Sequence, residues 1–239
     1  MTRYLFDVDG TLTNSRQKID PKFEEFMIDF CSGKSVAFVT GSDKDKTLEQ
    51  LGEKLFSLAD YSFNCAGNEV WHNGILVHKN EWYPSNELMW FFEELLAESK
   101  FQRTSKKHAV LIDNRNGMIN FSIPGRGCSQ EDRKAYVEWD KSTSERMRFR
   151  DKIAHKFPEI DVLIGGDTGL DIYPIGKGKE QVVDYLKKIE NEKTYYFGDQ
   201  IFPNGNDYKI AKRCDNSYRV KSWTETHEIL AFLEESAYC

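Results

Sequence analysis

Short apolar runs near the start of the chain end abruptly at polar residues, and an amphipathic stretch separates them. Residues 3–6 stop at Asp7, and residues 36–39 stop at Thr40. Uninterrupted apolar runs of this length are typical of strands buried on both faces, as in parallel sheets. Residues 21–30 predict a helix, so the order strand, helix, strand predicts a parallel α/β sheet. Both strands then end at the same edge of that sheet.

The pattern changes further along the chain. Asn73-Gly74, flanked by apolar residues, predicts a two-residue hairpin turn because both residues tolerate positive φ. From about Trp82, strands follow one another without a helix after each, which predicts an antiparallel α+β module. The elements expected there are a helix over 86–98, strands over 109–112 and 118–123, a long helix after Ser129, and strands over 162–164 and 170–173.

The α/β pattern resumes after this module. The expected elements are a helix near 178–189, a strand over 194–197 that leads to Asp199, and a last helix near 224–235. We therefore predict a discontinuous α/β core of the Rossmann type, residues 1–81 and 176–239, with a parallel sheet. Residues 82–175 are predicted to form an inserted α+β cap with an antiparallel sheet.

Composition and charge exclude several classes of protein. The 239 residues are 39% hydrophobic and 30% charged, an ordinary globular composition. Lys and Arg number 33 against 39 Asp and Glu, a formal charge of −6, so no broad basic surface for nucleic acid or membranes is expected. No apolar stretch approaches the roughly 20 residues that span a bilayer. We expect a cytoplasmic protein in which any anionic ligand needs a local basic pocket.

Asp7 and Asp9 place two carboxylates at the end of the first strand. Residues two apart in a strand point the same way, so both reach the carboxyl edge of the sheet, where open α/β sheets bind ligands. One carboxylate can attack a phosphoryl group while the other moves a proton to or from an oxygen. Neither can approach a phosphate dianion unaided, so Mg²⁺ is required, and Asp199 can supply a further ligand. An isolated pair of this kind is more often a surface turn, but its position after an apolar strand favours catalysis.

Four short motifs resemble those of the haloacid-dehalogenase-like (HAD) phosphotransferases. They are Asp7-Val8-Asp9-Gly10-Thr11-Leu12-Thr13, Thr40-Gly41-Ser42-Asp43, Lys179 with Lys177 as the alternative, and Gly198-Asp199 with Asn206-Asp207. The resemblance implies that Asp7 is the nucleophile and Asp9 the general acid/base. The other implied catalytic residues are Thr40, Ser42 and Lys179, and the implied metal ligands are Asp7, Asp9, Asp199 and Asp207. Asp207 could instead cap a helix.

The inserted module closely resembles the cap of the eukaryotic-type phosphomannomutases. The matching segments are residues 115–120, 124–133, 165–166 and 171–174, together with 16–19, 197–199 and 203–207 in the core. The resemblance implies interconversion of mannose 6-phosphate and mannose 1-phosphate through a hexose 1,6-bisphosphate, for GDP-mannose synthesis, in a homodimer assembled through the cap. The substrate-binding residues that it implies are Arg16, Arg115, Asn120, Arg126, Arg133, Gly169 and Asp171.

Arg133 is also expected to bind phosphate on physical grounds. Ser129 followed three residues later by Asp132 resembles a capping box, which places Arg133 in the first turn of a helix. A helix amino end attracts phosphate, and Arg adds bidentate donors. Arg115 and Arg126 flank the neighbouring strand and could close the same pocket. The alternative is that these are three ordinary surface arginines.

One departure from the family concerns the sugar. The family usually has Ser two residues before the position of Asp171, and this chain has Gly169 there. A hydroxyl contact with the substrate is therefore either lost or supplied by the neighbouring Thr168. For this reason the sequence does not decide between mannose and glucose phosphates.

Three functions are compatible with these residues. The first is a hexose-phosphate mutase, including a phosphoglucomutase-like enzyme of relaxed sugar specificity. The second is a sugar phosphatase on the same scaffold, in which water receives the phosphoryl group. The third is a non-catalytic sugar-phosphate-binding regulator, which would need neither a nucleophile nor a general acid. The cap arginines favour the mutase, because a mutase must hold a second phosphate while the bisphosphate reorients.

Overall fold

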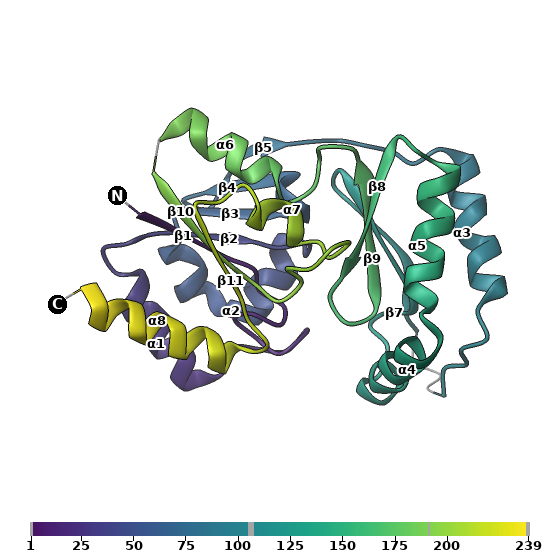
Figure 1. The fold of residues 1–239 in the computed structure, drawn as a ribbon, viewed down its shortest axis with the longest axis horizontal. Coiled ribbons are helices and arrows are strands. Elements are labelled where there is room, and N and C mark those ends of the chain that lie inside the picture. The colour runs from purple at the N-terminus through teal and green to yellow at the C-terminus, as the bar shows by residue number, and fades with distance from the viewer. Residues whose placement is uncertain (1, 105–107, 191, 238–239) are drawn as a thin grey trace.

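The computed structural model of the chain describes residues 2–104, 108–190 and 192–237, which form two units lying side by side (Figure 1). The strands of the larger unit are β1 (Thr2–Phe6), β2 (Ser35–Val39), β3 (Tyr61–Asn64), β4 (Glu69–His72), β5 (Ile75–Lys79), β10 (Lys193–Gly198) and β11 (Asn216–Arg219). Across the described part of this sheet they run in the order β11-β10-β1-β2-β3-β4-β5. The strands from β11 to β3 are parallel, and β4 and β5 pair antiparallel. The predicted α/β fold with a parallel sheet is confirmed.

Helices cover both faces of this sheet, as a parallel sheet requires. On one face lie α1 (Pro21–Cys31), α2 (Lys44–Leu58) and α8 (Trp223–Ala237), and on the other lie α6 (Gln181–Ile189) and α7 (Tyr208–Ala211). Successive strand residues alternate between the two faces. Phe6 and Phe38 pack toward the first set of helices, whereas Leu5 and Ala37 pack toward the second. The polar residues that follow β1, β2 and β10 are thereby left at the carboxyl edge of a three-layer core.

The predicted hairpin turn at Asn73-Gly74 joins β4 to β5 at the edge of the sheet. The φ angles of Asn73 and Gly74 are 50° and 75°. Both are positive, as a type I′ turn requires. The hairpin expected from this dipeptide is therefore confirmed.

The smaller unit is an antiparallel sheet with helices on one face. Its strands are β6 (Val110–Arg115), β7 (Met118–Arg126), β8 (Ile160–Gly165) and β9 (Gly169–Pro174), in the order β6-β7-β9-β8. Its helices are α3 (Asn86–Glu98), α4 (Gln130–Thr143), α5 (Glu145–Lys156). Ile119 and Phe121 of β7 pack against these helices, whereas Asn120 between them faces the larger unit. The alternation of β7 therefore gives the sheet a polar face over the carboxyl edge of the core.

Three details differ from the sequence expectations. The single long helix expected after Ser129 is two helices, α4 and α5, because Ser144 between them adopts a left-handed conformation with φ of 53°. Strands β3 and β11 were not expected, since both are four residues long and contain polar residues that interrupt any apolar run. The domain boundaries at residues 81 and 175 stay predictions.

Candidate active site

The site lies where three parallel strands of the core end beneath the cap sheet. Asp7 follows β1, Thr40 follows β2 and Asp199 follows β10. Asp7 and Thr40 line a cavity of about 50 Å³ together with residues of the turn between β8 and β9. The carboxyl ends of parallel strands thus form the floor of the site, and the polar face of the cap sheet forms its roof.

Lys179 is buried between two carboxylates. Its Nζ atom lies 2.6 Å from Oδ1 of Asp7 and 2.7 Å from Oδ1 of Asp207, and the residue is 1% exposed. These two negative charges outweigh the effect of burial and raise the pKa of Lys179, so its ammonium stays charged. Lys177, the alternative from the sequence, is exposed. The structure therefore places Lys179, and not Lys177, beside the predicted nucleophile.

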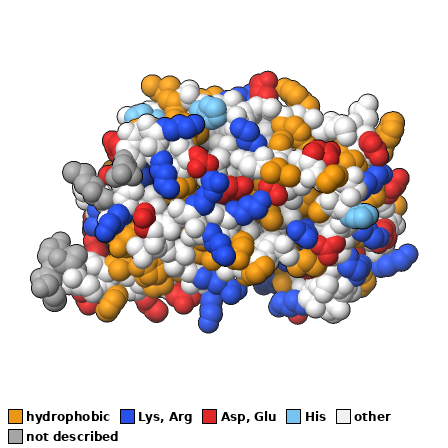
Figure 2. Space-filling model, turned by 45° about the horizontal axis from the view of Figure 1, so that its top comes forward, with side chains coloured by type: hydrophobic (Ala, Val, Ile, Leu, Met, Phe, Trp, Pro, Cys, Tyr) orange, Lys and Arg blue, Asp and Glu red, His pale blue; other side chains and the backbone are white. Residues whose placement is uncertain are grey.

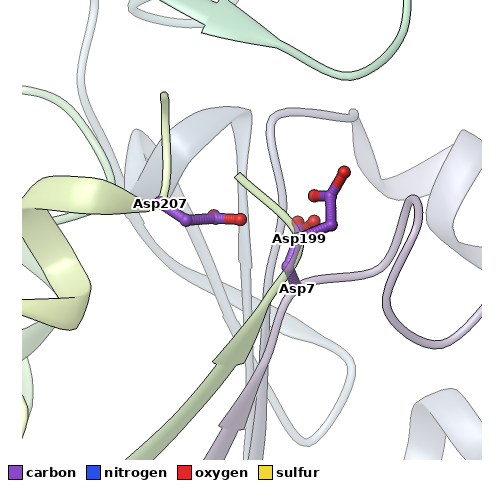
Figure 3. A group of neighbouring side chains, drawn as sticks. All are labelled: Asp7, Asp199 and Asp207. Carbon is purple, nitrogen blue, oxygen red and sulfur yellow. The ribbon is translucent and has the colours of Figure 1, made fainter. Parts of the chain in front are cut away.

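Asp7, Asp199 and Asp207 form an acidic cluster that could hold a metal ion. One carboxylate oxygen from each lies within 4.8 Å of the others. Figure 3 shows Asp7 and Asp199 at the ends of two adjacent strands, with Asp207 reaching toward them. Oδ1 of Asp199 is buried and has no hydrogen-bond partner among the residues that the structure describes, as expected of an atom that serves a ligand. Three carboxylates at this separation suit a hard divalent cation such as Mg²⁺.

The carboxylate of Asp9, also predicted as a metal ligand, lies outside this cluster. Its Oδ1 accepts hydrogen bonds from the backbone N–H of Arg16 at 2.6 Å and from Nε2 of Gln50 at 3.0 Å. Oγ of Ser42 is 3.5 Å from its Oδ2. Asp9 also lines the cavity beside Asp7, so its position suits proton transfer to a bound substrate.

Asp207 is held in the site and does not cap the helix that follows it. Its carboxylate accepts hydrogen bonds from Lys179, from the hydroxyl of Tyr196 and from the backbone N–H of Gln200. No side-chain capping bond is formed to α7 within the described residues. The capping alternative raised from the sequence is therefore wrong.

Three arginines line the cavity together with the carboxylates: Arg16, Arg115 and Arg133. Burial, together with the positive charges of Arg115 and Arg133, lowers the pKa of Arg16 to about 10. This crowding of cations is unfavourable unless an anion lies among them. The side chain of Arg126 lies next to this group, but it is paired with Asp43 at 2.7 Å and Asp113 at 3.0 Å. Of the three arginines predicted to close one pocket, Arg115 and Arg133 line this cavity and Arg126 does not.

Asp171 connects the cap to the core. Its Oδ1 accepts a hydrogen bond from Nδ2 of Asn120 at 2.8 Å, and its Oδ2 accepts one from Nδ2 of Asn206 at 2.8 Å. Asn120 belongs to β7 of the cap, whereas Asn206 belongs to the core loop that carries Asp207. The predicted substrate-binding residues Asn120, Asp171 and Gly169 all line the cavity. The structure thus brings the predicted cap and core residues to one place.

Sequence reasoning missed several residues that shape the site. Gln50 holds Asp9, Tyr196 holds Asp207, and Asn206 holds Asp171. Asn206 belongs to the motif Asn206-Asp207, but no role was predicted for its side chain. Its place next to a predicted metal ligand was the signal that could have found it. Gln50 and Tyr196 carry no such signal, because each is a single polar residue within a helix or strand.

Charges of both signs are interspersed on the molecular surface. On the face shown in Figure 2, Lys and Arg side chains lie across the middle of the molecule with Asp and Glu side chains between them. Such a mixed surface does not present one continuous basic region on this face. Within the parts of the chain that the structure describes, no helix is both long and apolar enough to cross a membrane.

Comparison with known proteins decides the family. The model of the family described as eukaryotic phosphomannomutase matches residues 23–235. The chain belongs to the eukaryotic phosphomannomutase family. The resemblance on which the sequence interpretation was based is therefore confirmed.

Relatives in the phosphomannomutase family match over most of the chain. Phosphomannomutase 1 of Mus musculus is 34% identical over 213 residues, covering 86% of this chain and 81% of that protein. A probable phosphomannomutase of Caenorhabditis elegans is 34% identical over 229 residues, covering 87% and 85% of the two chains. Phosphomannomutase 1 of Dictyostelium discoideum is 32% identical over 236 residues, covering 96% and 95%.

Solved structures show that this phosphomannomutase-family chain has the HAD fold. A HAD subclass IIB sugar phosphatase superposes with a TM-score of 0.62 at 15% identity, covering 100% of both chains. An IMP-bound IMP-nucleotidase of Plasmodium falciparum superposes with a TM-score of 0.64 at 17% identity, covering 98% of this chain and 68% of that one. At such low identity these likenesses concern the fold alone.

Proposed function

We propose that this chain is a phosphomannomutase that interconverts mannose 6-phosphate and mannose 1-phosphate through a hexose 1,6-bisphosphate, as a step toward GDP-mannose. The observation that carries the proposal is a single cavity lined both by Asp7 of the core, which is paired with the buried Lys179, and by Arg115 and Arg133 of the cap. The family membership of the chain supports the same reaction. A phosphatase for a monophosphate would need the Asp–Lys pair but not the arginines.

Asp7 and Asp9 divide the chemistry between them. In each phosphoryl transfer to the enzyme, an oxygen of Asp7 attacks phosphorus, the bond from phosphorus to the sugar oxygen breaks, and Asp9 gives its proton to that oxygen. In the reverse direction a sugar hydroxyl attacks the aspartyl phosphate and returns its proton to Asp9. Both residues are thereby restored after one transfer in each direction. The hydroxyls of Thr40 and Ser42 and the ammonium of Lys179 lie close enough to stabilise the transferring group.

We further propose that Asp7, Asp199 and Asp207 hold Mg²⁺. The ion would neutralise phosphate oxygens so that the Asp7 carboxylate can approach them. The partnerless Oδ1 of Asp199 and the spacing of the three carboxylates support this proposal. Asp9, bonded to Arg16 and Gln50, is left to transfer protons.

The pH dependence of metal binding tests this assignment. Burial, with the charge of Asp207 nearby, raises the pKa of Asp199 to about 7. A carboxyl group with a raised pKa in the folded state stabilises the fold while protonated, so metal-free protein loses that contribution between about pH 4 and pH 7. Mg²⁺ needs the ionised carboxylate. We expect Mg²⁺ to raise the melting temperature more at pH 8 than at pH 6, measured by thermal unfolding.

An Asp199→Asn variant is the control for this measurement. It cannot ionise at position 199, so its Mg²⁺-induced shift should be smaller than that of the unaltered protein and should differ less between the two pH values. Equal shifts in the unaltered protein at pH 6 and pH 8 would contradict the role of Asp199 as a titrating ligand.

Arg133 distinguishes a mutase from a phosphatase. Arg133 lies in the first turn of α4, and its guanidinium lines the cavity. Oγ of Ser129 caps this helix by accepting a hydrogen bond from the N–H of Asp132 at 3.1 Å. We expect Arg133→Ala to weaken the use of hexose phosphates by about 1.5–3 kcal/mol, the range for hydrogen bonds to charged groups. Hydrolysis of a small aryl phosphate, which has no second phosphate, should change little. Steady-state kinetics with mannose 1-phosphate and p-nitrophenyl phosphate measure both.

The matched control is Arg148→Ala on α5, which removes an exposed cap arginine that does not line the cavity. It should leave both reactions unchanged. Equal losses of both reactions in Arg133→Ala would make Arg133 a structural residue and would remove the cap-based support for a mutase.

Assembly and location complete the proposal. We propose a homodimer that forms through the cap, supported by Trp90 of α3, whose side chain is 68% exposed on the cap surface. Neighbouring Phe92 is fully buried in the cap core and is not available to a partner.

We also propose a cytoplasmic location, which follows from the sequence expectation alone.

A further inference from the structure

Thr168 lies in the turn between β8 and β9 and lines the cavity beneath the cap. The residue is 5% exposed. Its hydroxyl lies between Ser122 of β7 and Arg133 of α4. It therefore joins an inner strand of the cap sheet to the helix that carries a phosphate-binding candidate.

The hydrogen bonds of Thr168 leave its own hydroxyl hydrogen for a ligand. Oγ of Ser122 donates to Oγ1 of Thr168 at 3.2 Å, and Nη1 of Arg133 donates to the same oxygen at 3.4 Å. Ser122 does not line the cavity and its Oγ accepts from the N–H of Gly125 at 3.3 Å, so its hydrogen has Thr168 as acceptor. A threonine hydroxyl has two lone pairs and one hydrogen. Both lone pairs are in use, and among the described residues the hydrogen has no acceptor.

The neighbouring position carries no hydroxyl, because it is Gly169. A Cβ atom at Gly169 would lie 2.6 Å from Nδ2 of Asn120, which donates to Asp171. A side chain at position 169 would therefore require the end of the Asn120 side chain to shift. The glycine preserves that pair, and Thr168 is the residue of this turn that presents a hydroxyl beside Arg133.

The charge on Arg133 shows what kind of ligand this hydroxyl meets. In the described structure its ion-pair partner is Asp167, at 4.0 Å, which is too long for a hydrogen bond. Arg16 and Arg115 line the same cavity. Arg115 is already paired with Asp113 at 2.8 Å, so the charge that most needs a partner is that of Arg133. An anion with several acceptor oxygens would pair with Arg133 and accept the free hydrogen of Thr168 together.

We propose that Thr168 donates a hydrogen bond to the phosphate at the end of the hexose phosphate remote from Asp7, and so determines the affinity for that phosphate. The inference rests on the proposed function, because only a mutase holds its substrate by this remote phosphate. Thr168 acts next to Arg133, whose guanidinium its oxygen also orients. It supplies in this chain the hydroxyl that position 169 lacks.

Thr168→Val tests the proposal, because it keeps the shape of the side chain and removes the hydroxyl. We expect mannose 1-phosphate to bind about tenfold more weakly, the effect of losing one hydrogen bond to a charged group, measured by titration calorimetry. Thr168→Ser keeps the hydroxyl and should bind within about twofold of the unaltered protein. The melting temperature of Thr168→Val should stay close to that of the unaltered protein, which separates loss of a ligand contact from damage to the fold.

The outcomes separate this inference from the proposed function. Binding of mannose 1-phosphate by Thr168→Val within twofold of the unaltered protein would overturn the inference, as would an equal loss of affinity in Thr168→Ser. If the unaltered protein binds mannose 1-phosphate without converting it, the proposed mutase function fails. The ratio of the two dissociation constants still decides the role of Thr168 in that case.

Discussion

Asp7→Asn is expected to retain the fold and to abolish phosphoryl transfer, with a loss of about 10⁴-fold or more. An amide is a poor nucleophile and a weaker ligand for a divalent cation than a carboxylate. It has nearly the same shape, and its oxygen can still accept the hydrogen bond that Lys179 donates to Oδ1. The loss should therefore concern chemistry and not packing. A coupled assay for mannose 6-phosphate, with mannose 1-phosphate as substrate, measures it.

A second measurement tells whether Asp7 is the residue that becomes phosphorylated or only a metal ligand. The unaltered protein, mixed with radiolabelled hexose 1,6-bisphosphate and quenched in acid, should carry a covalent phosphate that hydroxylamine releases. Asp7→Asn should carry none. Asp29→Asn, the same chemical change on the exposed face of α1, should keep full activity and labelling. Turnover of Asp7→Asn near that of Asp29→Asn would remove the proposed mechanism.

Lys179→Met is expected to lower the free energy of unfolding by about 3–5 kcal/mol in metal-free protein, the cost of breaking a buried ion pair from one side. The change leaves Asp7 and Asp207 buried without the cation that now bonds to both. Asp199 in the same cluster adds to the repulsion. Urea unfolding in the presence of EDTA measures the loss.

Mg²⁺ should restore part of this stability, because a divalent cation compensates the same carboxylates. Activity should stay low even with Mg²⁺, since the ammonium beside Asp7, the proposed nucleophile, is gone. Lys177→Met is the matched control: this lysine is exposed, so its loss should change the free energy of unfolding by no more than about 0.5 kcal/mol. Equal stabilities of the two variants in EDTA would show that Lys179 is not the charge that balances the cluster.

Local patterns were sufficient to predict the framework of the site. Apolar runs ending at Asp7 and Thr40 located two strand ends on one sheet edge, and the spacing of Ser129 and Asp132 predicted where α4 begins. Each of these signals is contained within a few neighbouring residues. Periodicity and capping act over that distance, so the sequence alone carries them.

Contacts between distant parts of the chain could not be predicted in the same way. Gln50 reaches Asp9 from α2, and Tyr196 reaches Asp207 from β10. Such pairs depend on how a helix or strand is rotated within the packed core, which no local pattern specifies. The break at Ser144 was missed for a related reason, since serine is tolerated within helices and adopts its left-handed conformation between α4 and α5 here.

The small volume of the cavity has a consequence for the kinetics of a mutase. About 50 Å³ leaves room for only a few water molecules in the structure described, so the hexose bisphosphate of the proposed reaction has little room to turn end over end there. For that reaction we expect the cap to part from the core between the two transfers, which would break contacts such as that between Asp171 and Asn206. During that interval the intermediate can rebind in the other orientation or escape to solvent. In the proposed reaction, the closing rate of the cap, in competition with diffusion of the intermediate, would then set how often the enzyme must be primed again by free bisphosphate.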